Sequence, residues 1–419
     1  MSTLIKNVEV CDKSSSFHGK KVHILIENGR IVSISSNETK AEREFDGNNC
    51  KVSSGWFALR VSLGDPGFEH KETLESGTKA ALKGGFTNVF LMPTTKPIVQ
   101  TKDTISYILS KSASYVCNVY PMAAATVDLK GEEMAEILDL HHAGAVAFTD
   151  GAQPLSHAGL LTKLLQYLQP IDGLLLQHAE EKKLTQYGQM NEGITSTYLG
   201  LKGMPHIAEE IVILRDIELL EYIGGRIHFS HISSAKSVDI IRNAKKKGLK
   251  VTCDVSIPHL VFDDSVLNTF DTNYKINPPL RTKHDVEALW KGVADGTIDA
   301  IGIDHEPQDT ESKQLEFDQA EFGMIQLETA FAALNTHKPQ YIDSELIVEK
   351  LLASANLFNV ISPKIEVGEN ANLTMFSTDE AWSVDEENIL SKSKNTPFLG
   401  QTLRGKVKAV FNKNTLVTF

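Results

Sequence analysis

Several features are scarce or absent in this chain of 419 residues, and each absence excludes a class of protein. The four cysteines form no CxxC pair, so the sequence predicts neither a disulfide framework nor a zinc knuckle. No apolar run approaches the roughly 20 residues that a membrane-spanning helix needs. The N-terminus lacks the apolar segment of a signal peptide. We therefore expect a reduced, cytoplasmic protein.

Positive charge is also in short supply. The chain has 42 Lys and Arg against 54 Asp and Glu, which gives a formal net charge of −12. Nucleic acids and anionic membrane surfaces attract basic proteins, so we expect neither as a partner. Hydrophobic residues make up 41% of the chain and charged residues 23%, which is typical of a globular protein. The length is sufficient for a large barrel and a smaller domain.

The middle of the chain alternates between apolar runs and helical patterns. Eight runs are typical of buried strands: 56–62, 87–92, 116–123, 145–149, 174–178, 226–231, 250–254 and 300–304. Amphipathic helical patterns lie between most of them: 71–83, 101–111, 131–142, 157–168, 208–222, 235–247 and 283–293. Eight such units predict an α/β fold of the (β/α)₈ TIM-barrel type, although a doubly wound sheet has a similar periodicity.

Polar residues at the strand ends favour the barrel. Asp150, His178, His231 and Asp304 each lie at or just past the end of an apolar run. In a barrel the carboxyl ends of all the strands meet at one face, where reactive groups collect. We therefore expect these four side chains at the mouth of the barrel.

Both ends of the chain are typical of short strands. Asn28-Gly29 separates two alternating runs, which indicates a hairpin. The segments 373–376, 405–411 and 415–419 have the same character. We predict one small composite β-sandwich domain from residues 1–54 and 366–419, built beside a barrel of residues 55–365.

The stretch from Gly55 to Pro97 is the most informative part of the sequence. It is typical of a strand–helix–strand unit. It contains the motifs Pro66-Gly67, Lys71-Glu72-Thr73, Ser76-Gly77-Thr78, Gly84-Gly85, Met92-Pro93 and Thr95-Lys96-Pro97. These motifs resemble the first turn of the barrel in dihydroorotases, which are cyclic amidohydrolases. The resemblance spans nearly the whole chain and implies the same barrel and sandwich, a role in pyrimidine biosynthesis, and metal-dependent hydrolysis of a cyclic amide.

The resemblance also shows which metal ligands this chain lacks. Arg60 and Ser62 stand where the family has its HxH metal pair. The carboxylate that bridges the family's two metals falls at Gly151, with Asp150 beside it. On a regular strand Asp150 points away from that position, and only a local bulge would bring it back. Two bound metals are therefore not expected.

The side chains that bind the substrate carboxylate in the family are replaced as well. Its Arg, Asn and His correspond to Gly64, Thr94 and Gln308 in this chain. Glycine cannot replace the two-pronged guanidinium that binds a carboxylate. Other substrate-pocket positions are retained, namely Asn277, Phe322 and Gly323.

Three of the family's ligand positions survive. The resemblance implies that His178 and His231 end strands five and six and bind metal, and that Asp304 is both a ligand and the catalytic base. Three protein ligands and a water can hold one zinc ion, so a single reduced zinc site is an alternative to a site without metal.

Arg60 is the informative replacement. Residues 60 and 62 lie on one face of their strand, which looks into the barrel mouth in this register. A guanidinium there repels a divalent cation and attracts Asp304. We predict that Arg60 takes the place of the metal charge, because an unpaired buried carboxylate is costly. The alternative is that Arg60 swings out to solvent.

Two functions remain open from the sequence. The first is a catalytically inactive or impaired dihydroorotase homologue that acts as a structural or regulatory partner, for which the resemblance suggests aspartate carbamoyltransferase. The second is an active dihydroorotase, or a related cyclic amidohydrolase, that uses a reduced zinc site. A homo-oligomer is expected in either case.

Overall fold

Short parallel strands form a ring at the centre of the computed structural model, which describes residues 2–419. The ring contains β6 (Trp56–Val61), β7 (Phe86–Leu91), β8 (Asn118–Pro121), β9 (Leu175–His178), β12 (Ile227–Ser230), β13 (Val251–Ser256) and β14 (Ala300–Gly302). All neighbouring strands within the two runs β6-β7-β8 and β9-β12-β13-β14 pair in parallel.

Three isolated bridges close these runs into a barrel. Phe148 pairs with both Ala123 and Leu175, so the strand predicted over 145–149 contributes one bridged residue. Val61 pairs with His305 and joins the last strand to the first. The predicted (β/α)₈ barrel is confirmed, with its fourth strand reduced to this bridge.

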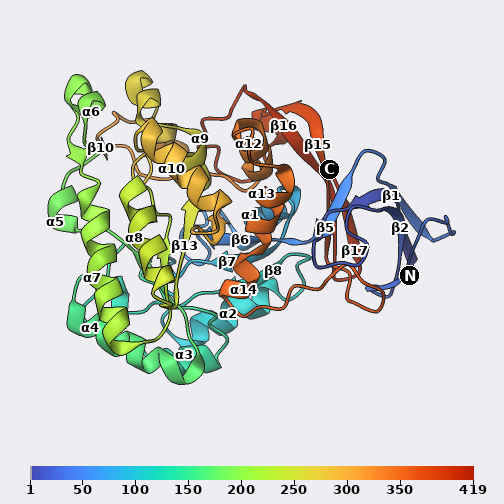
Figure 1. The fold of residues 1–419 in the computed structure, drawn as a ribbon, viewed down its shortest axis with the longest axis horizontal. Coiled ribbons are helices and arrows are strands. Elements are labelled where there is room, and N and C mark those ends of the chain that lie inside the picture. The colour runs from blue at the N-terminus through green and yellow to red at the C-terminus, as the bar shows by residue number, and fades with distance from the viewer. Residues whose placement is uncertain (1) are drawn as a thin grey trace.

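Helices surround the barrel (Figure 1). The main ones are α1 (Leu74–Lys83), α2 (Lys102–Ser112), α3 (Ile137–His142), α4 (Ala158–Leu168), α7 (Ile207–Ile223), α8 (Ala235–Lys246), α10 (Lys283–Ala294), α12 (Ala330–His337) and α13 (Ser344–Leu352). Shorter ones are α5 (Lys182–Thr185), α6 (Ile194–Leu199), α9 (Ile257–Val261), α11 (Thr310–Lys313) and α14 (Ser354–Leu357). A two-stranded ladder pairs β10 (Met190–Asn191) with β11 (Gly203–Met204). No helix within residues 2–419 combines the length and the apolar character needed to cross a membrane.

Local capping sets where two helices begin. Thr73 and Ser76 form a capping box at α1, so the helix starts three residues later than predicted. Helix α3 is also shorter than the predicted 131–142. There Met134 pairs with Thr126 in a bridge, which holds the preceding residues extended.

Strands from both ends of the chain form one eight-stranded sheet beside the barrel (Figure 1). Its order is β17-β16-β15-β5-β1-β2-β3, with β4 paired to β1. In β5 and β15, Val52 stands opposite Met375. The bounds are β1 (Ser2–Val10), β2 (Lys21–Glu27), β3 (Arg30–Ser35), β4 (Arg43–Asp46), β5 (Lys51–Ser54), β15 (Leu373–Ser383), β16 (Thr402–Asn412) and β17 (Thr415–Thr418).

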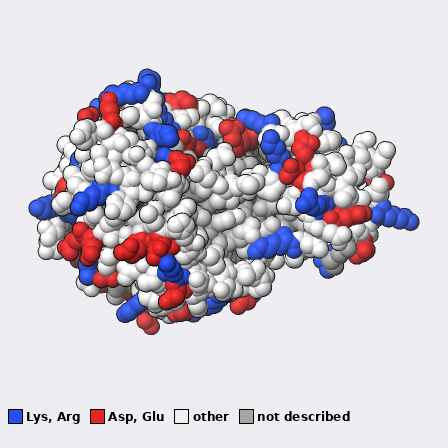
Figure 2. Space-filling model, turned by 90° about the horizontal axis from the view of Figure 1, so that it is seen from below, with Lys and Arg blue, Asp and Glu red and all other residues white. Residues whose placement is uncertain are grey.

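An aromatic cluster joins this sheet to the barrel. Trp56 at the start of β6 lies 5.2 Å from Phe331 and 5.3 Å from Phe376, measured between ring centroids. All three rings are buried. On the face seen in Figure 2, basic and acidic side chains are interspersed and the middle of the molecule carries few of either.

Candidate functional site

Arg60 and Asp304 form an ion pair at the mouth of the barrel. The two atoms, Nε of Arg60 and Oδ1 of Asp304, lie 3.2 Å apart, and the Arg60 side chain is 6% exposed. The pairing of β6 with β7 shifts register between Ala58 and Val61, and Arg60 itself has φ +61°. The predicted pair is therefore confirmed, although a bulged backbone rather than a regular strand aims the side chain.

Two histidines from β9 and the end of β12 lie beside this pair. The rings of His178 and His231 are 5.5 Å apart between centroids. Nδ1 of His231 lies 3.5 Å from Oδ1 of Asp304, a distance too long for a good hydrogen bond. Both ring nitrogens of His231 and Nδ1 of His178 are buried without a hydrogen-bond partner. The structure thus brings together the four residues Arg60, His178, His231 and Asp304.

The charge of Arg60 acts on the pKa of both of its neighbours, His231 and Asp304. Burial lowers the pKa of His231 well below its ordinary value, and the nearby Arg60 charge lowers it further. Burial raises the pKa of Asp304, whereas Arg60 opposes that rise. The histidine is consequently neutral and the carboxylate has one cationic partner.

A second carboxylate, Glu180, holds His178 in place. Its Oε2 lies 3.0 Å from Nε2 of His178 and 2.9 Å from Nζ of Lys182. It also accepts a hydrogen bond from Nδ2 of Asn277, at 3.2 Å. Although burial alone raises the pKa of Glu180, the contacts with His178 and Lys182 leave it below the ordinary value. Sequence reasoning found Asn277 but missed Glu180, for which the signal was its place two residues after His178.

A second buried pair, His228 and Asp254, holds the backbone at His231 in place. His228 Nε2 lies 2.8 Å from Oδ2 of Asp254, and the other oxygen of Asp254 accepts a hydrogen bond from the backbone N–H of His231. His231 has φ +36°, a left-handed conformation that needs such support. The sequence analysis missed Asp254, since its partner is 26 residues away and on another strand.

Asp150 serves a neighbouring loop. It accepts hydrogen bonds from the backbone N–H groups of Ala125, at 3.0 Å, and Thr126, at 2.9 Å, and from the Thr126 hydroxyl. The side chain is buried, and burial raises its pKa. Both oxygens are engaged with this loop, so Asp150 lies outside the cluster around Arg60.

Four of the predicted pocket positions line one small cavity of about 130 Å³ beside the cluster: Ser62, Gly64, Thr94 and Gln308. Nζ of Lys71 donates to Oε1 of Gln308 at 2.6 Å, and Nε2 of Gln308 donates to the Phe322 carbonyl at 2.7 Å. Gln308 is therefore occupied by the protein itself. Lys71 stands on the rim and was missed, although it lies within a recognised motif.

Glu306 also lines this cavity. Burial and the charge of Asp304 raise the pKa of Glu306 to about 7. Glu306 follows directly after Asp304-His305, and the sequence analysis did not single it out. Gly323 has φ +132°, and its N–H donates to the carbonyl of Lys275, whose ammonium lies 4.8 Å from the Phe322 ring centroid. Phe322 and Gly323 thus shape the loop behind Gln308.

The donor set does not fit the metal centre that the resemblance implies. Arg60 and Ser62 occupy the HxH positions, and the guanidinium contacts the carboxylate that would be a ligand. Nε2 of His178 is taken up by Glu180. Within residues 2–419, no group of three or more His, Cys, Asp or Glu side chains is arranged to hold a metal ion. With Arg60 on Asp304, the described side chains do not form the family's two-metal centre, and a zinc ion at His178, His231 and Asp304 requires Arg60 to move away from the carboxylate.

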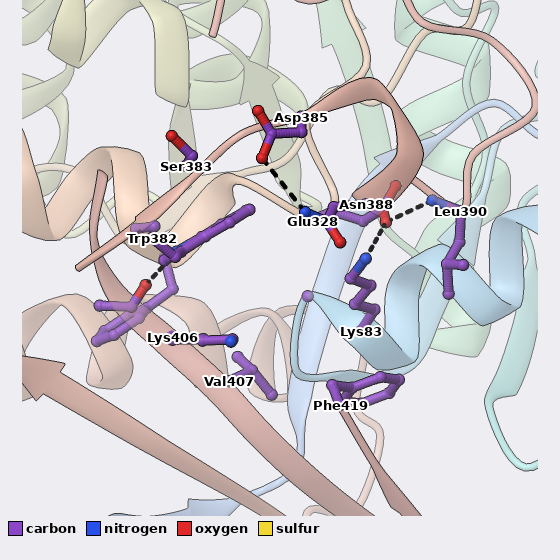
Figure 3. A pocket seen from close by; sticks show the side chains of 14 residues that line it. Lys83, Glu328, Trp382, Ser383, Asp385, Asn388, Leu390, Lys406, Val407 and Phe419 are labelled. Atoms are coloured by element: carbon purple, nitrogen blue, oxygen red, sulfur yellow. Dashed lines mark hydrogen bonds and ion pairs between the residues drawn. The ribbon is translucent and has the colours of Figure 1, made fainter. Parts of the chain in front are cut away.

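A further cavity, of about 350 Å³, lies between helices α1 and α12 and strands β15 and β16 (Figure 3). Glu328 in its wall accepts a hydrogen bond from the backbone N–H of Leu390 and lies 3.7 Å from Lys83. Trp382 donates from its indole N–H to the Gly405 carbonyl. None of the predicted site residues lines this cavity.

Comparisons with known proteins agree with this architecture. A family model described as dihydro-orotase-like matches residues 51–237. The chain is 40% identical to a dihydroorotase of Pelotomaculum thermopropionicum, over 97% of this chain and 96% of that protein. It is also 40% identical to a dihydroorotase of Acetivibrio thermocellus, over 99% of this chain and 98% of that protein.

Solved structures show the same fold. The chain is similar to the L-hydantoinase (dihydropyrimidinase) from Arthrobacter aurescens, with a TM-score of 0.87, 23% identity, and 99% and 96% of the two chains covered. It is similar to a dihydropyrimidinase from Brevibacillus agri, with a TM-score of 0.83, 21% identity, and 100% and 95% covered. The identity with the curated relatives along nearly their whole length shows that this chain belongs to the dihydroorotase family of cyclic amidohydrolases.

Proposed function

We propose that this dihydroorotase-family protein serves pyrimidine biosynthesis as a catalytically inactive or impaired homologue, in a structural or regulatory role. The observation that carries the proposal is the ion pair between Arg60 and Asp304. Asp304 is the family's catalytic base, and in this chain its carboxylate is neutralised by a fixed guanidinium. Arg60 opposes the rise in pKa that burial gives Asp304, and its guanidinium contacts an oxygen of the carboxylate that would accept a proton from water.

The rest of the mouth supports the same proposal. Hydrolysis of an unactivated amide in this family needs a nucleophilic water and a polarised carbonyl, which metal ions supply. Here the HxH positions provide one cation and one hydroxyl. Gly64 and Thr94 offer no fork for a substrate carboxylate, and Gln308 is bound by Lys71. Substrate binding and water activation are both weakened.

The proposed partner is aspartate carbamoyltransferase. The fold is retained along the whole chain, whereas the side chains that perform the chemistry have changed. Such a chain can serve assembly with an enzyme of the same pathway in place of catalysis. A fold does not by itself fix a function, so this step needs its own test.

The alternative function is an active cyclic-amide hydrolase. The names of the curated relatives favour it over the non-catalytic role, because both relatives are called dihydroorotase. His178, His231 and Asp304 also remain close together. A zinc ion can bind there only if Arg60 moves away from Asp304. The alternative therefore depends on the position of the Arg60 side chain.

The deciding experiment is dihydroorotase turnover by the purified protein, with and without added zinc. We expect no turnover and no bound zinc in the wild type. We expect zinc binding and partial turnover in the double variant Arg60→His/Ser62→His, which restores the HxH pair. Asp304→Ala in that background is the matched control, and it should abolish the turnover.

Wild-type turnover that disappears with Asp304→Ala would contradict the proposal and establish the active hydrolase. The partner is tested separately, by whether the wild type co-elutes with aspartate carbamoyltransferase from the same cell. Failure to co-elute would remove that partner and leave the inactive site unaffected.

A further inference from the structure

The cavity between the barrel and the eight-stranded sheet has a wall of aromatic rings. Phe331 of α12, Trp382 of β15 and Phe419 after β17 all line it. The indole N–H of Trp382 donates to the carbonyl of Gly405 at 2.9 Å, so the ring offers the cavity its apolar surface. Figure 3 shows Trp382 and Phe419 on different sides of the cavity. A flat apolar ring of a ligand fits against such side chains.

Two lysines bring positive charge to this apolar wall. Lys83, the last residue of α1, and Lys406 of β16 line the cavity, with side chains that are 20% and 34% exposed. Nζ of Lys83 lies 3.7 Å from Oε1 of Glu328, and Nζ of Lys406 lies 3.4 Å from Oε1 of Glu380. Both distances are longer than a good hydrogen bond. Within residues 2–419 no ion pair joins either lysine to another carboxylate, so both ammonium groups retain unused donors.

The two carboxylates have closer partners of their own. Glu328 accepts hydrogen bonds from the backbone N–H groups of Leu390, at 2.7 Å, and Ser391, at 3.1 Å. The two oxygens of Glu380 accept hydrogen bonds from Nζ of Lys408, at 3.0 and 2.9 Å. Either carboxylate would have to give up these shorter bonds in order to close on its lysine in the cavity.

The electrostatics around Lys83 favour an added anion. Burial lowers the pKa of Lys83, Glu328 opposes that change, and the charges of Lys406 and Lys394 lower the pKa further. Asp385 also lines the cavity, but it is exposed to water and, in the part of the chain that the structure describes, pairs with neither lysine. An anionic group between the two ammonium groups would offset their repulsion and accept charge-assisted hydrogen bonds.

We propose that this cavity binds a small molecule that has a flat apolar ring and one anionic group, as an aromatic carboxylate has. The ring lies against Trp382 and Phe419, and the anionic group accepts hydrogen bonds from Lys83 and Lys406. A volume of about 350 Å³ and a mainly apolar wall with a few charged groups are typical of small-molecule sites. The proposal does not depend on whether the barrel mouth is active.

One segment joins this cavity to the barrel mouth. Leu390 lines the cavity, and Glu328 in the wall holds the N–H groups of Leu390 and Ser391. Four residues further, Oδ1 of Asn395 accepts a hydrogen bond from the backbone N–H of Gln308, at 3.1 Å. A ligand that contacts Leu390 therefore restrains a segment that also holds a residue of the mouth.

The first test is isothermal titration calorimetry of the purified chain with 2-naphthoate and with 2-naphthamide, its uncharged counterpart. We expect a Kd of about 1 mM or lower for 2-naphthoate. We expect 2-naphthamide to bind at least about tenfold more weakly, because hydrogen bonds to a charged group are the stronger ones. A wild type that does not bind 2-naphthoate overturns the proposal, as does equal affinity for the two compounds.

Variants of the two lysines test the charged part of the site. Lys83→Met/Lys406→Met should weaken the binding of 2-naphthoate at least about tenfold. The matched control is Lys79→Met, which removes an exposed lysine of the same helix that does not line the cavity and should leave the Kd unchanged. A double variant with wild-type affinity contradicts the proposal, and so does a control that weakens binding as much.

The second test locates the ligand on the wild type and therefore does not depend on the stability of a variant. Bound 2-naphthoate should slow the hydrogen exchange of the backbone amides of Leu390 and Ser391 several-fold, because it restrains their segment. Helix α7, at the edge of the barrel away from this cavity in Figure 1, should exchange at an unchanged rate. Protection that is absent at Leu390 and Ser391, or that appears in α7, overturns the proposed site.

Discussion

Arg60→Met is the substitution that tests the electrostatic account of the barrel mouth most directly. It keeps most of the side-chain volume but removes the guanidinium, so the Asp304 carboxylate loses its cationic partner. The side chains of the pair are 6% and 15% exposed, which makes this a largely buried ion pair. Breaking such a pair by removing one partner costs about 3–5 kcal/mol.

This cost converts into a measurable change in the unfolding temperature. An unfolding entropy of about 2.1 cal/mol/K per residue over 419 residues gives about 0.9 kcal/mol/K. We therefore expect Arg60→Met to lower the midpoint of thermal unfolding by roughly 3–6 °C at pH 8. Arg242→Met is the matched control, because Arg242 pairs with Asp295 at the surface, where ion pairs contribute little.

The pH dependence has a definite sign. Burial raises the pKa of Asp304 in the folded chain, and removing Arg60 raises it further. A carboxyl whose folded pKa exceeds its unfolded value contributes stability that is complete at low pH and is lost as the pH rises through the folded pKa. The stability that Arg60→Met loses relative to the wild type should therefore be largest at pH 8 and smaller at pH 5.

Two results would refute this reasoning. One is an Arg60→Met variant that unfolds at the wild-type temperature at both pH values. The other is a double variant Arg60→Met/Asp304→Asn that is no more stable than Arg60→Met, since neutralising the carboxylate should restore most of the loss.

Three further substitutions test other buried carboxyl groups. Asp150→Ala leaves two buried backbone N–H groups without an acceptor, so we expect a loss of about 3 kcal/mol in a urea titration, and an unchanged midpoint would contradict the loop-holding role. Glu306→Gln removes a carboxyl whose pKa is raised to about 7, so the stability that this group contributes in the wild type is lost as the pH rises from 4.5 through 7. Between pH 5 and pH 8 the stability of the variant relative to the wild type should therefore rise by up to about 3 kcal/mol, measured by thermal unfolding. The same difference at both pH values would count against burial of the charge. Glu72→Gln weakens the acceptor for the hydroxyl of Ser391 and the N–H of Lys392, so limited proteolysis between residues 385 and 394 should accelerate, and an unaltered cleavage rate would argue against this anchor.

The sequence predicted the barrel because its signals are local. Motifs between Gly55 and Pro97 specify one strand–helix–strand unit, and apolar runs mark the remaining strands. The run at 145–149 pairs only at Phe148, because apolar content indicates burial without showing how many residues pair. The helical pattern over 208–222 was visible too, but the amphipathic interpretation did not account for the exposed Ile211 and Leu214.

The candidate site was predicted where the family motifs constrain it and missed where side chains meet across strands. Arg60 and Asp304 were paired correctly from charge and register, although the structure uses a bulge with φ +61° at Arg60. Glu180 was not predicted as the partner of His178, nor Asp254 as the support of His231. Such contacts depend on which rotamers the packed barrel allows, and no periodicity in the sequence reports that.

The pairing of β5 with β15 has a consequence for how the chain folds during synthesis. Val52 finds its partner Met375 more than 300 residues later. A ribosome that adds 5–20 residues per second makes that partner available only after roughly 15–65 s. Throughout that interval the whole barrel emerges while the β5 edge has no strand to pair with, and an open edge is a site for aggregation. The last fifty residues therefore cover the open strand edge of the first fifty by pairing with it. A chain truncated before β15 is expected to depend on chaperones to remain unaggregated.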